Sequence, residues 1–131
     1  MAVDHSVNQF YIVERIADGV IVRRTPARHR ELPEVGAAFA WIYAQLRGEE
    51  LSRLPLLIDL RAIIGRNDAP FEEELAPHRR RLLTSFARAG ILVRSTVGAM
   101  QVQRMVASEG IEIAVFTSEA DGLSWLHSPD P

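Results

Sequence analysis

Hydrophobic and polar residues are distributed along this chain in a way that divides it into short strand-like and longer helix-like segments. Two runs rich in β-branched and aromatic residues, 10–16 (FYIVERI) and 20–24 (VIVRR), flank an Asp18-Gly19 step. This arrangement is typical of a β-hairpin, because Asp-Gly readily adopts the tight turns that join antiparallel strands. The chain is therefore predicted to open with a hairpin.

After the hairpin, helix-like and strand-like segments alternate. Helical spacing of apolar residues extends over about 33–47, 68–87, 95–109 and 118–126. Short apolar runs at 54–60, 91–94 and 111–116 predict strands, and the first has almost no alternation, as in a strand covered on both faces. Pro77 interrupts the second helical segment, so we expect a kink or two abutting helices there.

Candidate capping residues stand at the starts of three of these helices. Asp68 precedes the second helix as an N-cap, with Pro70 in the first turn. Ser95 or Thr96 can cap the third helix, and residues 118–121 (SEAD) resemble a capping box before the last one. These residues predict where the helices begin.

The resulting order is β-β-α-β-α-β-α-β-α, which predicts an α/β fold. Strands that alternate with helices form a mainly parallel sheet, here of about five strands with about four helices, and the hairpin adds an antiparallel pair. We expect a single domain over residues 9–126. Residues 1–8 and 127–131 are expected to be flexible tails.

Composition narrows the chemistry that such a domain can carry. The chain has 131 residues, no cysteine and fifteen basic residues, all of them arginine. Thiol nucleophiles, zinc–thiolate sites, Schiff bases and a Walker-A lysine are therefore excluded. The net charge of −2 argues against nucleic-acid binding. No apolar run is long enough to span a membrane and no signal peptide is visible, so a cytoplasmic location is expected.

No motif indicates a metal or a cofactor. The four histidines, at positions 5, 29, 78 and 127, lack the spacing of a metal centre. The chain also has no G-x-S-x-G elbow, dinucleotide loop or P-loop. We therefore predict no cofactor, no metal and no catalytic residue.

The loops that follow the strands gather arginines and hydroxyl groups. In open α/β sheets, ligands favour this rim, where helix N-termini also point. Arg28, Arg94, Ser95 and Thr96 are candidates for an anion site. The competing interpretation is that these arginines are ordinary solvated side chains.

Asp59 ends the most apolar strand and invites comparison with the phosphorylated aspartate of receiver domains. That chemistry also needs an acidic pair after the first strand and a lysine after the last one, and neither is present. We therefore interpret Asp59 as a structural carboxylate bonded to loop amides or to a nearby arginine.

At two places the sequence resembles a known family. The buried strand that ends in L-I-D-L-R (57–61), before a loop and an acidic helix start, is similar to the STAS domain (sulfate transporter and anti-sigma factor antagonist). The closing segment V-F-T-S-E-A-D-G-L-S-W-L (115–126) resembles the ending of small SpoIIAA-like bacterial proteins of this group. The resemblance covers about residues 9–126.

This resemblance implies a regulatory domain that binds a protein partner. In anti-sigma factor antagonists, a serine in the loop after this strand is phosphorylated by a partner kinase, and the added charge breaks the complex. Residues 61–68 (RAIIGRND) contain no serine or threonine, so that switch cannot be carried over. Arg61, Arg66, Asn67 and Asp68 are the candidates for partner contact, although Asp68 can also be only a helix cap.

Two other functional hypotheses remain open. The SpoIIAA-like group is similar to lipid carriers of the SEC14 kind, so an apolar pocket for a lipid or small molecule is one alternative. Its candidate lining residues are Phe71, Leu75, Phe86, Met100 and Met105, which ordinary core packing also explains. An enzyme built only from Asp, Glu, Arg and Ser side chains is the least favoured hypothesis. A homodimer through Trp41 and Tyr43, or through the hairpin edge, is left open.

Overall fold

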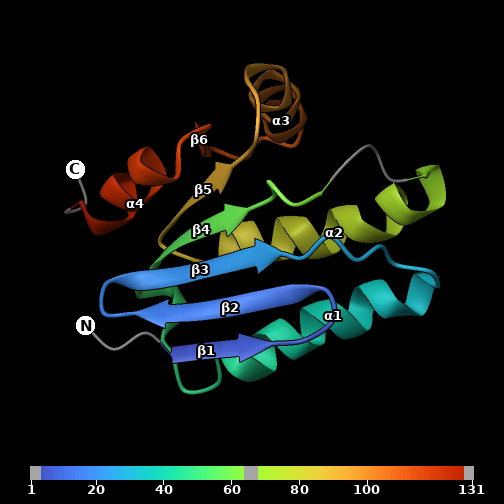
Figure 1. The fold of residues 1–131 in the computed structure, drawn as a ribbon, viewed down its shortest axis with the longest axis horizontal. Helices are drawn as coiled ribbons and strands as arrows, with labels where there is room; N and C mark the ends of the chain where they lie inside the picture. Colours follow the sequence, from blue (N-terminus) through green and yellow to red (C-terminus); the bar gives the residue numbers. More distant parts are fainter. Residues whose placement is uncertain (1–3, 64–67, 129–131) are drawn as a thin grey trace.

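The computed structural model describes residues 4–63 and 68–128, which form one mixed six-stranded sheet with helices on both faces (Figure 1). The strands are β1 (Asp4–Val7), β2 (Tyr11–Ile16), β3 (Gly19–Arg24), β4 (Pro55–Asp59), β5 (Arg88–Leu92) and β6 (Ala114–Phe116). The helices are α1 (Leu32–Gln45), α2 (Ala69–Ser85), α3 (Thr96–Ser108) and α4 (Glu119–His127), with a short 3₁₀ turn at Leu51–Arg53.

The strands lie side by side in the order in which they occur in the chain, from β1 to β6. β1, β2 and β3 are antiparallel neighbours, and β3, β4, β5 and β6 run parallel. The predicted α/β class, opening hairpin and mainly parallel sheet are therefore confirmed. All parallel pairs are joined through a helix, as short connections cannot join parallel strands.

One strand was missed. The prediction of about five strands placed residues 4–7 in a flexible tail, whereas they form β1 and pair with β2. This segment (DHSV) has one apolar residue and no hydrophobic alternation, so its own pattern carries no strand signal. It is ordered by the hydrogen-bonding edge that β2 offers.

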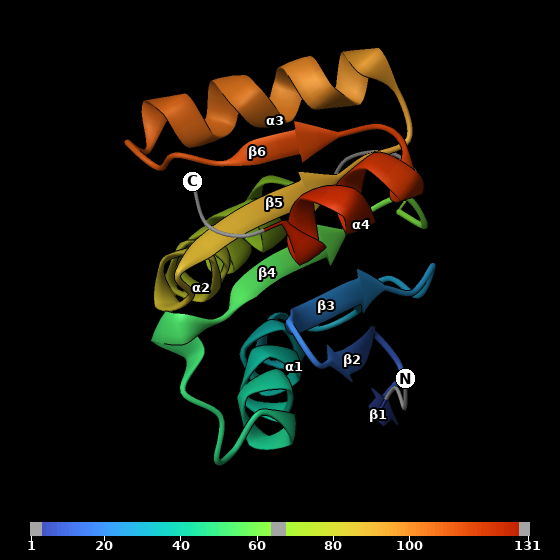
Figure 2. The same cartoon turned by 90° about the vertical axis from the view of Figure 1, so that its left-hand side faces the viewer.

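The two faces of the sheet bury cores of different size. The larger core lies on the face covered by α1 and α2 and includes Val22, Phe39, Leu56, Ile58 and Leu82. On the other face α4 covers a smaller core of Ile21, Leu57, Leu92 and Leu126. Figure 2 shows α4 over this second face and α3 beside β6. Because successive residues of β4 enter opposite cores, that strand lacks polar alternation, as predicted.

The helix starts follow the predicted residues, with one correction. The hydroxyl of Ser95 accepts a hydrogen bond from Gly98 N at 3.1 Å, and that of Ser118 accepts one from Asp121 N at 3.3 Å. Asp68 does occupy the N-cap position of α2, but its side chain makes no capping hydrogen bond. Its position was predicted correctly and its capping role was not.

Helix α2 continues through Pro77 as one element, so the alternative of two abutting helices is wrong. Proline removes one hydrogen bond from a helix interior and frees the carbonyl four residues earlier. Pro77 and Glu73 are both exposed, so water can solvate the freed carbonyl. Leu82 and Leu83 hold the following turns against the core.

Candidate functional site at the end of β4

The parallel register of β3 and β4 places Arg23 directly beside Asp59. Both residues lie at the carboxyl ends of their strands, at the rim where the sequence predicted functional loops. Asp59 is buried, with 6% of its surface exposed. A carboxylate in such a position requires hydrogen-bond partners, because an unpaired buried charge is costly.

Two arginines supply these partners. Arg23 Nη1 donates to Asp59 Oδ2 at 2.7 Å. Arg61 binds in a fork, with Nε 3.0 Å from Oδ1 and Nη2 2.9 Å from Oδ2, and its backbone N–H donates to Oδ1 at 3.0 Å. Since a carboxylate has about four acceptor positions, these four hydrogen bonds saturate Asp59.

Two further carboxylates complete the arrangement. Glu119, in the first turn of α4, accepts from Arg23 Nη1 at 2.8 Å and from Arg61 Nη2 at 2.5 Å. Glu14 of β2 accepts from Arg23 Nε at 2.8 Å. We call Glu14, Arg23, Asp59, Arg61 and Glu119 the Asp59 cluster. It joins β2, β3, β4, the following loop and α4.

The charges of the cluster stabilise one another. Burial raises the pKa of Asp59, but hydrogen bonds from the side chain and backbone of Arg61 and from Arg23 outweigh it, so this pKa lies below its ordinary value. The hydrogen bond from Arg23 also lowers the pKa of Glu119. Burial lowers the pKa of Arg23, yet its bonds to Asp59, Glu14 and Glu119 raise it overall. All these groups are therefore ionised at neutral pH.

The geometry gives Asp59 a structural role, which confirms the interpretation made from sequence. Its acceptor positions are filled by protein donors, which leaves none for a metal ion or for attack on a phosphoryl group. Arg23 is bonded to three carboxylates through Nε and Nη1. The cluster instead fixes residues 60–63, where Leu60 N donates to Leu92 O at 2.9 Å and Ile63 N to Leu60 O at 3.2 Å.

The predicted partner-contact residues fall into three groups. Arg61 belongs to the Asp59 cluster and keeps 36% of its side-chain surface exposed. Asp68 is exposed at the start of α2. Arg66 and Asn67 lie outside the described residues. Contact of any of these residues with a partner stays a prediction.

The residues predicted for an anion rim are spread over two loops. Arg28 is exposed in the loop after β3, while Arg94, Ser95 and Thr96 follow β5. β4 separates these two strands in the sheet. Arg94 Nη2 donates to Ile63 O at 2.9 Å and so ties the loop after β5 to the loop after β4. The structure brings Arg94, Ser95 and Thr96 together; anion binding by them stays a prediction.

Of the five apolar residues considered for a lipid pocket, three belong to the larger core or pack on it, Met105 is half-buried and Met100 is exposed. Phe86 is buried, and Phe71 and Leu75 pack against the larger core. Met100, by contrast, points outward with 51% of its surface exposed. This arrangement gives the lipid-carrier alternative no support.

Among residues 4–63 and 68–128, no group of three or more His, Asp or Glu side chains is arranged to hold a metal ion. Within the same residues, no helix is both long and apolar enough to cross a membrane.

Sequence reasoning missed Arg23, Glu14 and Glu119 as members of the cluster. A signal existed for Arg23, because neighbouring parallel strands that end together place their last residues side by side. Glu119 was visible only as an acidic residue in a helix first turn. Its approach to Asp59 depends on how α4 packs, which the sequence pattern does not specify.

No protein-family model and no curated protein matches this chain. Two solved structures do match over nearly the whole length. One is an anti-sigma factor antagonist from Mycobacterium paratuberculosis, with a TM-score of 0.57, 15% identity and coverage of 97% of this chain and 96% of that one. The other is an uncharacterized protein with a SpoIIAA-like fold from Shewanella loihica, with a TM-score of 0.61, 14% identity and coverage of 95% and 92%. The chain therefore has a SpoIIAA-like fold, as the resemblance implied.

Proposed function

We propose that this chain is a non-enzymatic regulatory domain that binds a protein partner through the loop after β4 and the start of α2. The fold similarity to an anti-sigma factor antagonist supports a regulatory role. The observation that carries the proposal is the Asp59 cluster, which fixes the described start of this loop with charged hydrogen bonds rather than presenting a reactive group. Ordering residues 60–63 before the partner arrives lowers the entropic cost of binding.

The chemistry of the partner follows from the charge of the surface. Asp68, Glu73 and Glu74 are exposed at the start of α2, and no basic residue lies between them in the sequence. Their charge favours a partner with a basic surface, since complementary charges speed association and set specificity. The absence of a hydroxyl group between residues 61 and 68 implies that phosphorylation of this loop does not control the complex.

The inference that the domain is not an enzyme rests on the described titratable groups. Asp59 is saturated, and burial raises the pKa of Tyr11 to about 12, which makes it a poor acid or base near neutral pH. Lysine and cysteine do not occur in the chain.

A quantitative affinity purification from the native host tests the proposal. The bait proteins are the natural chain, the double variant Asp68→Arg/Glu73→Arg and the control Glu112→Arg, which reverses one exposed charge before β6. We expect a partner that is retained by the natural chain and the control and lost by the double variant. A partner retained equally by all three baits would contradict the proposed surface.

A further inference from the structure

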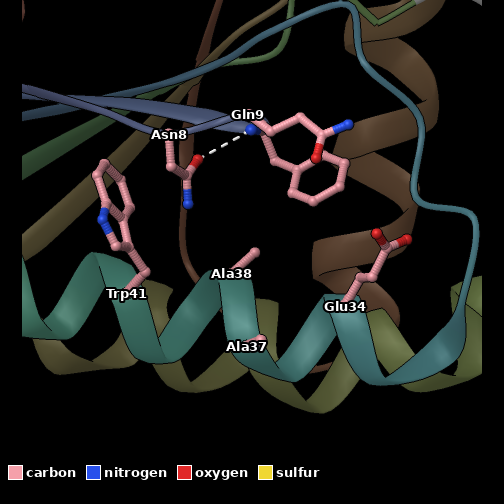
Figure 3. A pocket seen from close by; sticks show the side chains of 7 residues that line it. Asn8, Gln9, Glu34, Ala37, Ala38 and Trp41 are labelled. Atoms are coloured by element: carbon pink, nitrogen blue, oxygen red, sulfur yellow. Dashed lines mark hydrogen bonds between the residues drawn. The ribbon is translucent and has the colours of Figure 1, made fainter.

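A depression of about 330 Å³ lies between the β1–β2 turn and α1, on the face of the sheet opposite α4 (Figure 3). Its lining residues are Asn8, Gln9, Phe10, Glu34, Ala37, Ala38 and Trp41. This volume is within the range of small-ligand pockets. The Asp59 cluster includes Glu119 of α4, which covers the other face of the sheet, so the depression is separate from that cluster.

Asn8 gives the depression a hydrogen-bond donor. Its Oδ1 accepts from Phe10 N at 2.9 Å and from Tyr11 N at 2.7 Å, which fixes the orientation of the amide. The remaining Nδ2 group points toward α1, on the side where Trp41 and Ala38 lie (Figure 3).

Among the described residues, Glu34 is the only charged one that lines the depression. Its Oε1 accepts from the backbone N–H groups of Arg30 and Glu31 at 2.5 and 2.8 Å, and these bonds lower the pKa of its carboxyl group. Oε2 accepts no hydrogen bond from a described residue and is available to a ligand. Between Glu34 and Trp41, two alanines leave an apolar floor.

The open edge of β1 leads directly to this depression. β1 is the first strand of the sheet and pairs only with β2 among the described residues. Asn8 N bonds to Tyr11 O, so in the alternating antiparallel pattern Ser6 faces β2 while the backbone groups of His5 and Val7 face outward. Val7 is 64% exposed. Such an edge can accept one more strand.

We propose that an extended peptide segment of a partner protein pairs with the edge of β1 and inserts an arginine or lysine side chain into this depression. The aliphatic part of that side chain packs on Ala37 and Trp41, and its cationic end meets Glu34. Long basic side chains combine an apolar stem with a charged head, which is the combination that this lining offers. We infer a cationic occupant because the lining residues that the structure describes carry one negative and no positive charge.

Fluorescence anisotropy with a synthetic probe tests this inference independently of the α2 surface. The probe is a labelled seven-residue peptide of alternating valine and threonine with one central arginine, and its matched control has glutamine at that position. We expect the arginine peptide to bind the natural chain at least about fivefold more tightly than the glutamine peptide.

Three variants and one control separate the contributions. In Glu34→Gln, the amide oxygen can still accept the two backbone hydrogen bonds, but the negative charge is lost. This variant should therefore bind the two peptides equally well. Ala37→Leu fills the depression, and Val7→Pro removes an outward N–H without touching the β1–β2 ladder. Each should weaken the arginine peptide about tenfold, whereas Ala40→Leu, on an exposed position outside the lining, should not.

Three results would overturn the proposal: equal binding of the two peptides to the natural chain, no effect of Ala37→Leu or no effect of Val7→Pro. Analytical ultracentrifugation adds a further one. If the natural chain formed a dimer that Ala37→Leu dissociated, and if it bound no peptide, a second copy of this chain would occupy the edge instead.

Discussion

Asp59→Asn is the sharpest test of the Asp59 cluster, because it removes one charge and almost no volume. Asparagine can keep Oδ1 toward Arg61 and so retain two of the four hydrogen bonds made there. Its Nδ2 group then faces Nη1 of Arg23 and Nη2 of Arg61, which are also donors. Two hydrogen bonds are lost, and two partly exposed guanidinium groups lose their shared countercharge.

The magnitude follows from burial. Removing one member of a buried ion pair costs about 3–5 kcal/mol. Asp59 is 6% exposed, whereas the side chains of Arg23 and Arg61 are 21% and 36% exposed, so solvent screens part of this loss. Glu119 and Glu14 still neutralise Arg23, which places the expected loss near the lower end, about 3 kcal/mol in the free energy of unfolding. For a domain of this size that corresponds to a decrease in Tm of about 10 °C.

Urea denaturation followed by circular dichroism measures this loss. The matched control is Glu119→Gln, because the Glu119 side chain is 40% exposed and belongs to the same cluster. We expect the control to lose less than about 1 kcal/mol. If Asp59→Asn also lost less than about 1 kcal/mol with an unchanged m-value, the cluster would not be a stabilising element, and our account of the rim would be wrong.

Three further predictions concern pH and packing. Folding lowers the pKa values of Asp59 and Glu119. The stabilisation that these carboxylates provide is therefore complete above their unfolded pKa values of about 4, and it is lost as the pH falls through the lower folded values. Acid titration of the natural chain should show a steeper loss of stability below about pH 4 than acid titration of Asp59→Asn. Gly90→Ala would place a Cβ atom 2.9 Å from Trp125 Cζ3. We therefore expect a loss of about 1–3 kcal/mol in the free energy of unfolding and a shifted tryptophan emission, whereas an unchanged stability would contradict the tight packing. Gly98→Ala in α3 places a Cβ atom no closer than 3.4 Å to its neighbours and should raise the free energy of unfolding by up to about 1 kcal/mol in the same denaturation experiment; a loss of stability would contradict this prediction.

The fold was predictable where the local pattern matched the tertiary environment. The apolar run at 54–60 predicted a strand buried on both faces, and β4 contributes Leu56 to one core and Leu57 to the other. The hairpin followed from its Asp-Gly step in the same way. In these two segments, the local conformational preference of the residues and their burial in the fold favour the same structure.

Long-range contacts set the limit of sequence reasoning. Arg23 and Glu119 are separated by 96 positions, and both reach Asp59 only because strand register and helix packing bring them there. Asp68 shows the same limit locally: its position before the helix was predictable, while the lack of a side-chain capping hydrogen bond was not. β1 depends on a neighbour's free edge rather than on its own residues.

The order of the strands has a consequence for how the protein is made. Because the sheet follows chain order, every strand from β2 to β6 emerges from the ribosome after the strand that it joins. The sheet can therefore grow outward one strand at a time during translation, and no strand after the first waits for a later partner. Glu119 arrives with the last helix, which also covers Leu57 and Leu92. A chain that stops before α4 lacks both that cover and a carboxylate of the cluster, so the C-terminal helix completes the fold in both its apolar and its charged contacts.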